Sequence, residues 1–184
     1  MQKTNTYLFK EGLATNMIET KRIILRRMTE DDTDQLLLIF TDPRVMASFD
    51  GLLFDRTKME AWVRRNLEHQ IKYGYGLFSV FLKNEGILIG DCGLEHMDVD
   101  GKTEGELGYD IRSDYWRKGY ATEAASAVRE YAFTVIGLNR LISLIRPSNI
   151  ASIRVAEKTG MIKEQSIKRS GHVYYIYSIV PELI

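Results

Sequence analysis

Basic and small side chains at residues 115–124 (YWRKGYATEA) have the chemistry of an anion-binding turn. A strand-like segment precedes this run and apolar residues at helical spacing follow it, which predicts that Gly119 lies near a helix N-terminus. The first N–H groups of a helix lack intrahelical partners and carry a positive field, so they can hold a phosphate. Arg117 and Lys118 add charge, while Gly119 and Ala121 leave room for a pyrophosphate. A capped surface helix with incidental basic residues is the alternative interpretation.

A second pattern lies about one helix and one strand further along the chain, at residues 149–161. Its characteristic residues are Asn149, Ser152, Glu157, Lys158, Gly160 and Met161. Together the two patterns resemble the GCN5-related N-acetyltransferases, and within them the branch that acetylates ribosomal protein N-termini and its small-molecule-acetylating relatives. In that family a basic-x-x-Gly-x-Gly/Ala turn is followed by an Asn-x-x-Ser/Ala…Glu-Lys-x-Gly-Phe/Met helix. The resemblance begins at about residue 18 and extends to the C-terminus, well beyond one short motif.

The resemblance implies that acetyl-coenzyme A binds as a cosubstrate, with its pyrophosphate in the turn. The implied cofactor contacts are Tyr109, Asp110, Ile111, Arg117, Lys118, Gly119, Tyr120, Ala121, Thr122, Asn149, Ser152 and Lys158. Family members place the pantetheine along a splayed strand, where backbone N–H groups of residues 109–111 would hold the oxyanion. Gly108 is expected to mark the bulge that splays this strand. Trp116 departs from the Gln or Arg that is common at the first turn position, but backbone amides make most of the expected contacts.

The attacking amine must lose a proton, which calls for a general base. Glu106 is the first candidate, because histone-modifying relatives carry their basic Glu at the corresponding place, just before an apolar strand. A solvated carboxylate at a sheet edge is the alternative interpretation, since carboxylates mark functional sites only statistically. Asp91, Glu95 and His96 are the second-rank candidates.

The departing coenzyme A thiolate also needs a proton donor. Many family members use a Tyr seven residues after the Asn, but this chain has Ala156 there. Ser152 is the best remaining hydroxyl, acting on the sulfur directly or through an ordered water, and it completes the predicted catalytic pair with Glu106. The alternative is that Ser152 only caps its helix or bonds to backbone.

These residues require a set of elements to position them. Strands are predicted at residues 21–28, 75–82, 87–97, 104–112, 138–145, 162–169 and 173–180, and helices at 29–42, 57–74, 120–136 and 149–159. Thr57 and Glu60 form a capping-box pattern at the start of the second helix, and Gly74 is its predicted end. Short turns such as Asp100-Gly101 indicate an antiparallel meander.

The predicted fold class is therefore α+β, a mixed and mostly antiparallel seven-stranded sheet flanked by helices. The resemblance implies that this sheet is splayed between its fourth and fifth strands. No repeat, low-complexity segment or linker interrupts the chain, so residues 1–184 are expected to form a single N-acetyltransferase domain. Residues 1–17 would be an N-terminal extension and residues 18–184 the core.

The amino-acid composition limits which binding partners and which cellular compartment are expected. The 184 residues hold 25 Lys and Arg against 25 Asp and Glu, and this lack of basic excess argues against a nucleic acid partner. Cys92 is the only cysteine, is expected as a small buried hydrophobe, and fits a reducing compartment. Residues 1–16 lack the apolar run of a secretory signal, and no membrane span is expected, which predicts a cytoplasmic protein. The histidines show no metal-ligand spacing with Cys92, so no metal is expected.

The resulting functional prediction is an acetyl-coenzyme A-dependent N-acetyltransferase that moves the acetyl group to a primary amine by direct attack in a ternary complex. Related enzymes use ribosomal protein N-termini, polyamines, amino acids and aminoglycosides, so the acceptor is either a small-molecule amine or a protein N-terminus. Acceptor choice is expected to lie between Asp31 and Gly74. The oligomeric state, monomer or homodimer, stays open. A catalytically weak acyl-coenzyme A-binding protein that acts through a partner is the alternative, favoured by the missing Tyr.

Overall fold

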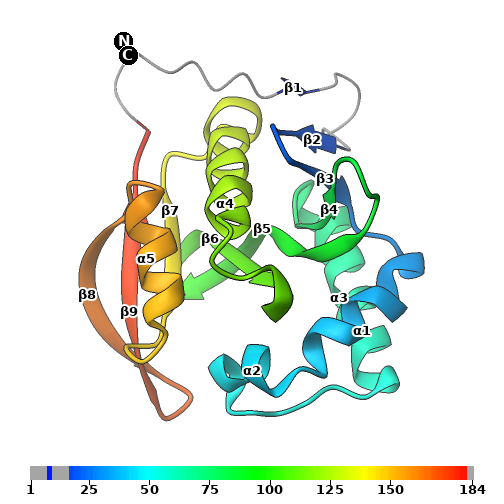
Figure 1. Ribbon diagram of the computed structural model, residues 1–184. Coiled ribbons are helices and arrows are strands. Elements are labelled where there is room, and N and C mark those ends of the chain that lie inside the picture. Colours follow the sequence, from blue (N-terminus) through cyan, green and yellow to red (C-terminus); the bar gives the residue numbers. More distant parts are fainter. Residues whose placement is uncertain (1–7, 10–16, 182–184) are drawn as a thin grey trace.

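The computed structural model describes residues 8–9 and 17–181, which build one open sheet with helices on both faces (Figure 1). The sheet has nine strands in the order β1-β2-β3-β4-β5-β6-β7-β9-β8. The strands are β1 Leu8–Phe9, β2 Met17–Glu19, β3 Ile23–Arg27, β4 Leu77–Leu82, β5 Leu88–Val99, β6 Lys102–Ile111, β7 Leu141–Ile145, β8 Ile162–Arg169 and β9 His172–Ile179. The helices are α1 Thr33–Phe40, α2 Pro43–Met46, α3 Arg56–Tyr73, α4 Tyr120–Tyr131 and α5 Ile150–Lys158.

Alternation along the strands separates two hydrophobic clusters. Phe78 packs with the buried face of α4 in the larger cluster, whereas its neighbour Leu77 packs with α1 and α3 in the second. Adjacent strand residues point to opposite faces, so α4 covers one face of the sheet and the α1–α3 pair covers the other. The functional residues of β5 and β6 are therefore divided between two differently covered faces.

The predicted α+β fold is confirmed, and the sheet is larger than expected. All seven predicted strands are present, and β1 and β2 extend the sheet ahead of the first of them. Residues 1–7 and 10–16 lie outside the described residues. The predicted N-terminal extension and the predicted lack of a secretory signal depend on these residues. No helix in the described part of the chain is long and apolar enough to cross a membrane.

The splay lies where the resemblance implied, between β6 and β7. These two strands run parallel and share a single pair, Glu106 opposite Ile142, whereas β6 pairs with β5 along its whole length. Two side-chain bonds bridge the start of the splay: the Ser143 hydroxyl donates to the Leu107 carbonyl at 2.7 Å, and the Leu144 N–H donates to Glu106 Oε1 at 3.2 Å. Residues 108–111 of β6 thus face an opening rather than a neighbouring strand.

Two local expectations were wrong. Gly108 marks no bulge, because the β5–β6 register runs through Gly93 and Gly108 without a shift; the nearest irregularity is in β4–β5. The start of α3 is capped by Asp55, whose side chain accepts from the Lys58 N–H at 2.8 Å, rather than by a box at Thr57. The predicted end at Gly74 is confirmed, since its φ of 76° is the left-handed conformation that glycine favours.

Candidate active site

The predicted anion-binding turn leads directly into α4. Gly119 is the N-cap of this helix with φ 85°, and Arg117 is also left-handed with φ 63°. Gly119 has no side chain with which to cap the helix, so the first N–H groups of α4 are left for a ligand. The local backbone therefore has the form that the sequence pattern predicted.

A partly exposed ion pair holds this turn against the start of β3. Arg22 Nε lies 2.6 Å from Glu123 Oε2 in the first turn of α4, and Arg22 Nη1 donates to the Lys118 carbonyl at 2.9 Å. The Arg22 guanidinium also stacks over the Tyr120 ring, 4.5 Å from its centroid. Sequence analysis missed this brace, because the paired residues are about a hundred positions apart and nothing local links them.

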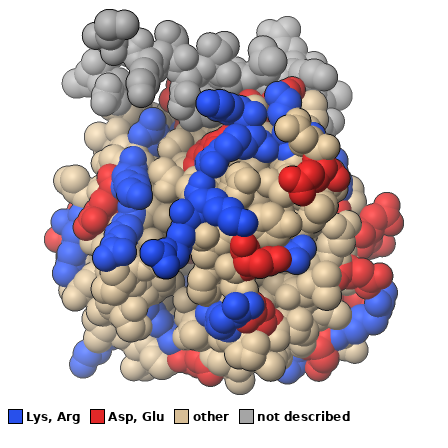
Figure 2. All heavy atoms as spheres, in the orientation of Figure 1, with Lys and Arg blue, Asp and Glu red and all other residues tan. Residues whose placement is uncertain are grey.

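A cavity of about 590 Å³ opens between this turn, the end of β6, α5 and the segment around α2. Eleven of the twelve predicted cofactor residues line the cavity: Tyr109, Asp110, Ile111, Arg117, Lys118, Gly119, Ala121, Thr122, Asn149, Ser152 and Lys158. Tyr120 does not, since its ring lies between Arg22 and Tyr115. Lys and Arg side chains gather on the face that carries α4 and α5 (Figure 2), and Arg154 adds a further basic group to the lining.

Ser152 is free to act in the cavity because another residue caps its helix. Asn149 is the N-cap of α5, and its Oδ1 accepts from the Ser152 N–H at 3.1 Å. Within the described residues the Ser152 hydroxyl makes no hydrogen bond, so it has no capping role. The Tyr109 hydroxyl donates to the Ser152 carbonyl at 3.0 Å, which fixes this turn of α5 against β6. Burial raises the pKa of Tyr109, so its phenol stays protonated in this bond.

The position of the missing Tyr faces away from the cavity. Ala156 is fully buried in the larger hydrophobic cluster, where its helix packs on the sheet. A large side chain there would have to displace core residues, because protein interiors are close-packed. The Ala is therefore part of the packing of α5 in this protein.

Glu106 lies at the start of the splay, opposite another carboxyl group. Its direct partner across the β5–β6 ladder is Glu95, and its Oε1 accepts from the Leu144 N–H. Burial, and then the charge of Glu95, raise the pKa of Glu106 to about 7. Glu106 does not line the cavity itself, but Asp110, on the same face of β6, does.

A second carboxyl pair lies four residues further along the same ladder. Asp91 is directly opposite Asp110 and is 1% exposed. Burial, and then the charge of Asp110, raise the pKa of Asp91 well above its usual range, and burial likewise raises the pKa of Asp110. Sequence analysis treated Asp91 as a second-rank base and Asp110 as a cofactor contact, and it did not foresee that the two face each other.

The structure places the remaining candidates away from the cavity. The His96 ring stacks on Tyr73 with 4.1 Å between centroids, at the C-terminal end of α3. Cys92 is fully buried and burial raises the pKa of its thiol, which agrees with the predicted small core residue. Among the residues that the structure describes, no three His, Cys, Asp or Glu side chains are grouped so as to hold a metal ion.

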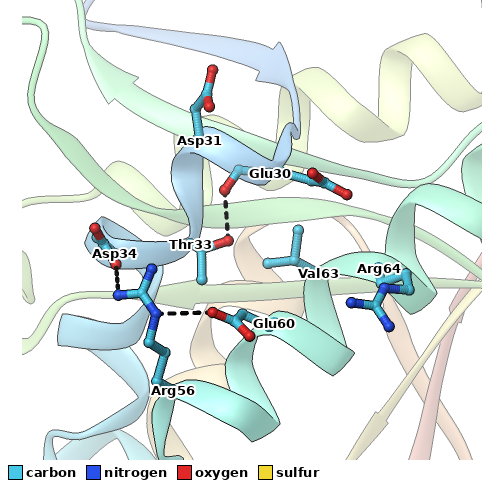
Figure 3. A pocket seen from close by; sticks show the side chains of 8 residues that line it. All are labelled: Glu30, Asp31, Thr33, Asp34, Arg56, Glu60, Val63 and Arg64. Carbon is cyan, nitrogen blue, oxygen red and sulfur yellow. Dashed lines mark hydrogen bonds and ion pairs between the residues drawn. The ribbon is translucent and has the colours of Figure 1, made fainter.

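A separate cavity of about 390 Å³ lies between α1 and α3 (Figure 3). Its carboxylates are already partnered in part: Arg56 Nη1 lies 2.6 Å from Asp34 and Arg56 Nε lies 2.8 Å from Glu60. These groups are exposed, and exposed ion pairs contribute little free energy. It shares no lining residue with the larger cavity.

A splayed sheet with an uncapped helix N-terminus at its opening is the architecture of an acyl-transferring enzyme. An acetyltransferase of the GNAT family from Bacillus anthracis has a TM-score of 0.76 at 28% identity, covering 89% of this chain and 98% of that one. RimL, a ribosomal L7/L12 α-N-protein acetyltransferase in complex with coenzyme A, has a TM-score of 0.74 over 88% of this chain and 95% of that one; at 17% identity this likeness shows the fold alone.

Sequence comparison gives the same result. YkkB of Bacillus subtilis (strain 168) is 36% identical over 165 residues, which cover 89% of this chain and 95% of YkkB. The family model described as Acetyltransferase (GNAT) domain matches residues 22–162. The chain therefore belongs to the GNAT family of acetyltransferases, and the resemblance recognised in its motifs is confirmed.

Proposed function

We propose that this protein transfers the acetyl group of acetyl-coenzyme A directly to a primary amine while both are bound. The observation that carries the proposal is the cavity, which joins the uncapped N-terminus of α4 to the opening between β6 and β7. Its basic side chains and free N–H groups suit a pyrophosphate, and its other end reaches Tyr109 and Asp110. A thioester extended along this path would end beside the carboxyl groups of β6.

Glu106 is proposed as the general base. The nitrogen of the amine attacks the thioester carbon, a C–N bond forms, and the proton on nitrogen passes to the Glu106 carboxylate, directly or through one water. Its pKa of about 7 makes Glu106 both available as a base and able to hold the proton at neutral pH. Backbone N–H groups at the open edge of residues 109–111 are proposed to stabilise the oxyanion.

Ser152 is proposed to help protonate the leaving group, the coenzyme A thiolate. When the C–S bond breaks, the electron pair stays on sulfur. The thiolate takes a proton from a water held by the Ser152 hydroxyl, or from that hydroxyl itself, which regains a proton from solvent water. The support is its position in the cavity lining and the lack of any other hydrogen bond to this hydroxyl among the described residues. Tyr109 holds the same turn of the helix in place through the Ser152 carbonyl.

Two measurements on the purified protein test the proposal. Acetyl-coenzyme A should raise the melting temperature in a concentration-dependent way, because it binds the folded state alone. Release of free coenzyme A should then depend on added amine, screened over small amines and short peptides with free N-termini; RimL, by its name, uses a protein N-terminus. Stabilisation without amine-dependent thiol release would contradict the proposal and favour an acyl-coenzyme A-binding protein.

A further inference from the structure

One face of the β5–β6 ladder carries two carboxyl pairs with glycines between them. Because Asp91 is opposite Asp110 and Glu95 opposite Glu106, all four side chains lie on the same face of the two strands. Gly93 and Gly108 form the pair between them. Opposing acidic side chains are unfavourable in a sheet, so a cation that binds them would remove this cost.

One carboxylate oxygen of this face has no partner. Asp91 Oδ2 is buried and makes no hydrogen bond within the described residues. Its neighbour on β4, Ser79, donates its hydroxyl to Asp32 instead, at 2.8 Å. No Arg or Lys among the described residues bonds to Asp91 or to Asp110 either. An unsatisfied buried polar atom is rare in native proteins and calls for a partner that donates hydrogen bonds.

Space for such a partner lies beside Gly108. A Cβ placed on Gly108 would meet no atom within 4 Å, whereas a Cβ on Gly93 would collide with the backbone of Gly76. The open strip at Gly108 therefore lies between Glu106 and Asp110 on the same face of β6, and Asp110 also lines the large cavity.

The spacing of the two pairs indicates a ligand with two amino groups rather than one. Glu106 and Asp110 are four residues apart, which corresponds to about 13 Å of extended strand between their Cα atoms. We infer that the acceptor is a small aliphatic di- or polyamine, whose reacting amine lies at Glu106 and whose second ammonium group binds between Asp91 and Asp110. The inference rests on the proposed acetyl transfer and adds the class of acceptor to it. An unbranched methylene chain fits the strip beside Gly108, and the ammonium supplies the missing donors to Asp91.

Matched amines test this inference. With saturating acetyl-coenzyme A, putrescine and spermidine should give a kcat/KM roughly 10- to 100-fold above that of n-butylamine, because one more charge-assisted hydrogen-bonded contact is made. Asp91→Asn should reduce this preference to within about 3-fold, while the same change at Asp98, an exposed residue of the same strand, should retain it. Putrescine without acetyl-coenzyme A should raise the melting temperature of the parent and not that of Asp91→Asn.

The outcomes separate the inference from the proposed function. Equal kcat/KM values for butylamine and putrescine would overturn the diamine site and leave acetyl transfer standing. Transfer to no amine, with stabilisation by putrescine that Asp91→Asn abolishes, would support the site and overturn the proposed reaction. The absence of both transfer and stabilisation would overturn both. A preference that survives in Asp91→Asn would also overturn the site.

Discussion

At the scale of single residues, Glu106 combines burial with a hydrogen bond from the Leu144 N–H and an opposing Glu95. Its pKa of about 7 means that the basic form increases through neutral pH, so the rate of the parent should rise between about pH 6 and pH 8. A carboxyl group of ordinary pKa would give no such rise from this source.

Glu106→Gln should therefore lower the rate on an amine acceptor by roughly 10²- to 10⁴-fold, with an unchanged dissociation constant for acetyl-coenzyme A. The defect should shrink as the pH rises, because more of the amine in solution is already deprotonated. Glu104→Gln is the matched control, since Glu104 lies on the same strand and is paired with Arg140 at 3.2 Å. A near-parent rate in Glu106→Gln at pH 7 would remove this residue from the mechanism.

Ser152→Ala tests the leaving-group role. Turnover should fall by about 10-fold or more, while the affinity for acetyl-coenzyme A stays within a few-fold, because the hydroxyl acts on the developing thiolate. The melting temperature should not change, since Asn149 caps the helix. Asn149→Ala is the comparison, and it should cost about 1 kcal/mol of stability through loss of the cap. Unchanged turnover in Ser152→Ala would assign the proton to water or to Tyr109.

At the scale of elements, the turn before α4 owes its shape to a left-handed glycine and its rigidity to Arg22. A Cβ on Gly119 would lie 3.4 Å from Arg22 Nη2, the mobile end of a side chain, so a short polar residue can be placed there. Asn and Asp both tolerate the left-handed conformation and have nearly the same shape. The two substitutions therefore differ mainly in charge.

Gly119→Asp should weaken acetyl-coenzyme A binding at least about 10-fold more than Gly119→Asn, because it sets a carboxylate against the pyrophosphate. Calorimetric titration of both variants gives the comparison, and their melting temperatures without ligand verify that both are folded. Equal dissociation constants for the two variants would mean that the anion does not bind at this turn.

The same elements show what local sequence can and cannot predict. The turn, α4 and α5 follow from short-range patterns, so they were predicted at nearly their observed positions. The carboxyl pairs were within reach too, because a hairpin turn at Asp100-Gly101 fixes the register that brings Asp91 opposite Asp110. The sequence could not decide between Asp55 and Thr57 as the cap of α3, because both residue types cap helices well.

At the scale of the whole molecule, the segment around α2 lines the large cavity with Val45 and Ser48 and bonds to distant loops. Asp42 accepts a hydrogen bond from the Ser113 hydroxyl. Asp50 forms a bidentate ion pair with Arg146, with N–O distances of 2.5 and 2.8 Å. Ser48 accepts from the Asn149 side chain at 3.0 Å. These contacts join residues about 70 to 100 positions apart, so local sequence patterns do not predict them.

The free energy of unfolding should depend on pH through the four carboxyl groups on one face of β5 and β6. The pKa values of Asp91, Asp110, Glu95 and Glu106 are all raised, with burial as the first cause. Over a range that begins near pH 4, the folded state then holds more protons on these groups than the unfolded state does. Their contribution to stability is therefore lost as the pH rises through the raised values, to about 7 for Glu106.

Asp91→Asn isolates this effect, because groups elsewhere in the chain contribute equally to parent and variant. The Asn side chain is neutral at every pH and its amide can donate to Asp110, its partner across the ladder. The variant should match the parent closely at pH 5 and exceed its melting temperature by several degrees at pH 8, since about 1 kcal/mol corresponds to 2–4 °C in a chain of this size. A difference that is the same at both pH values would show that Asp91 does not titrate upward in the folded state. A gain in stability joined to a loss of diamine preference would show that this buried charge is retained for binding.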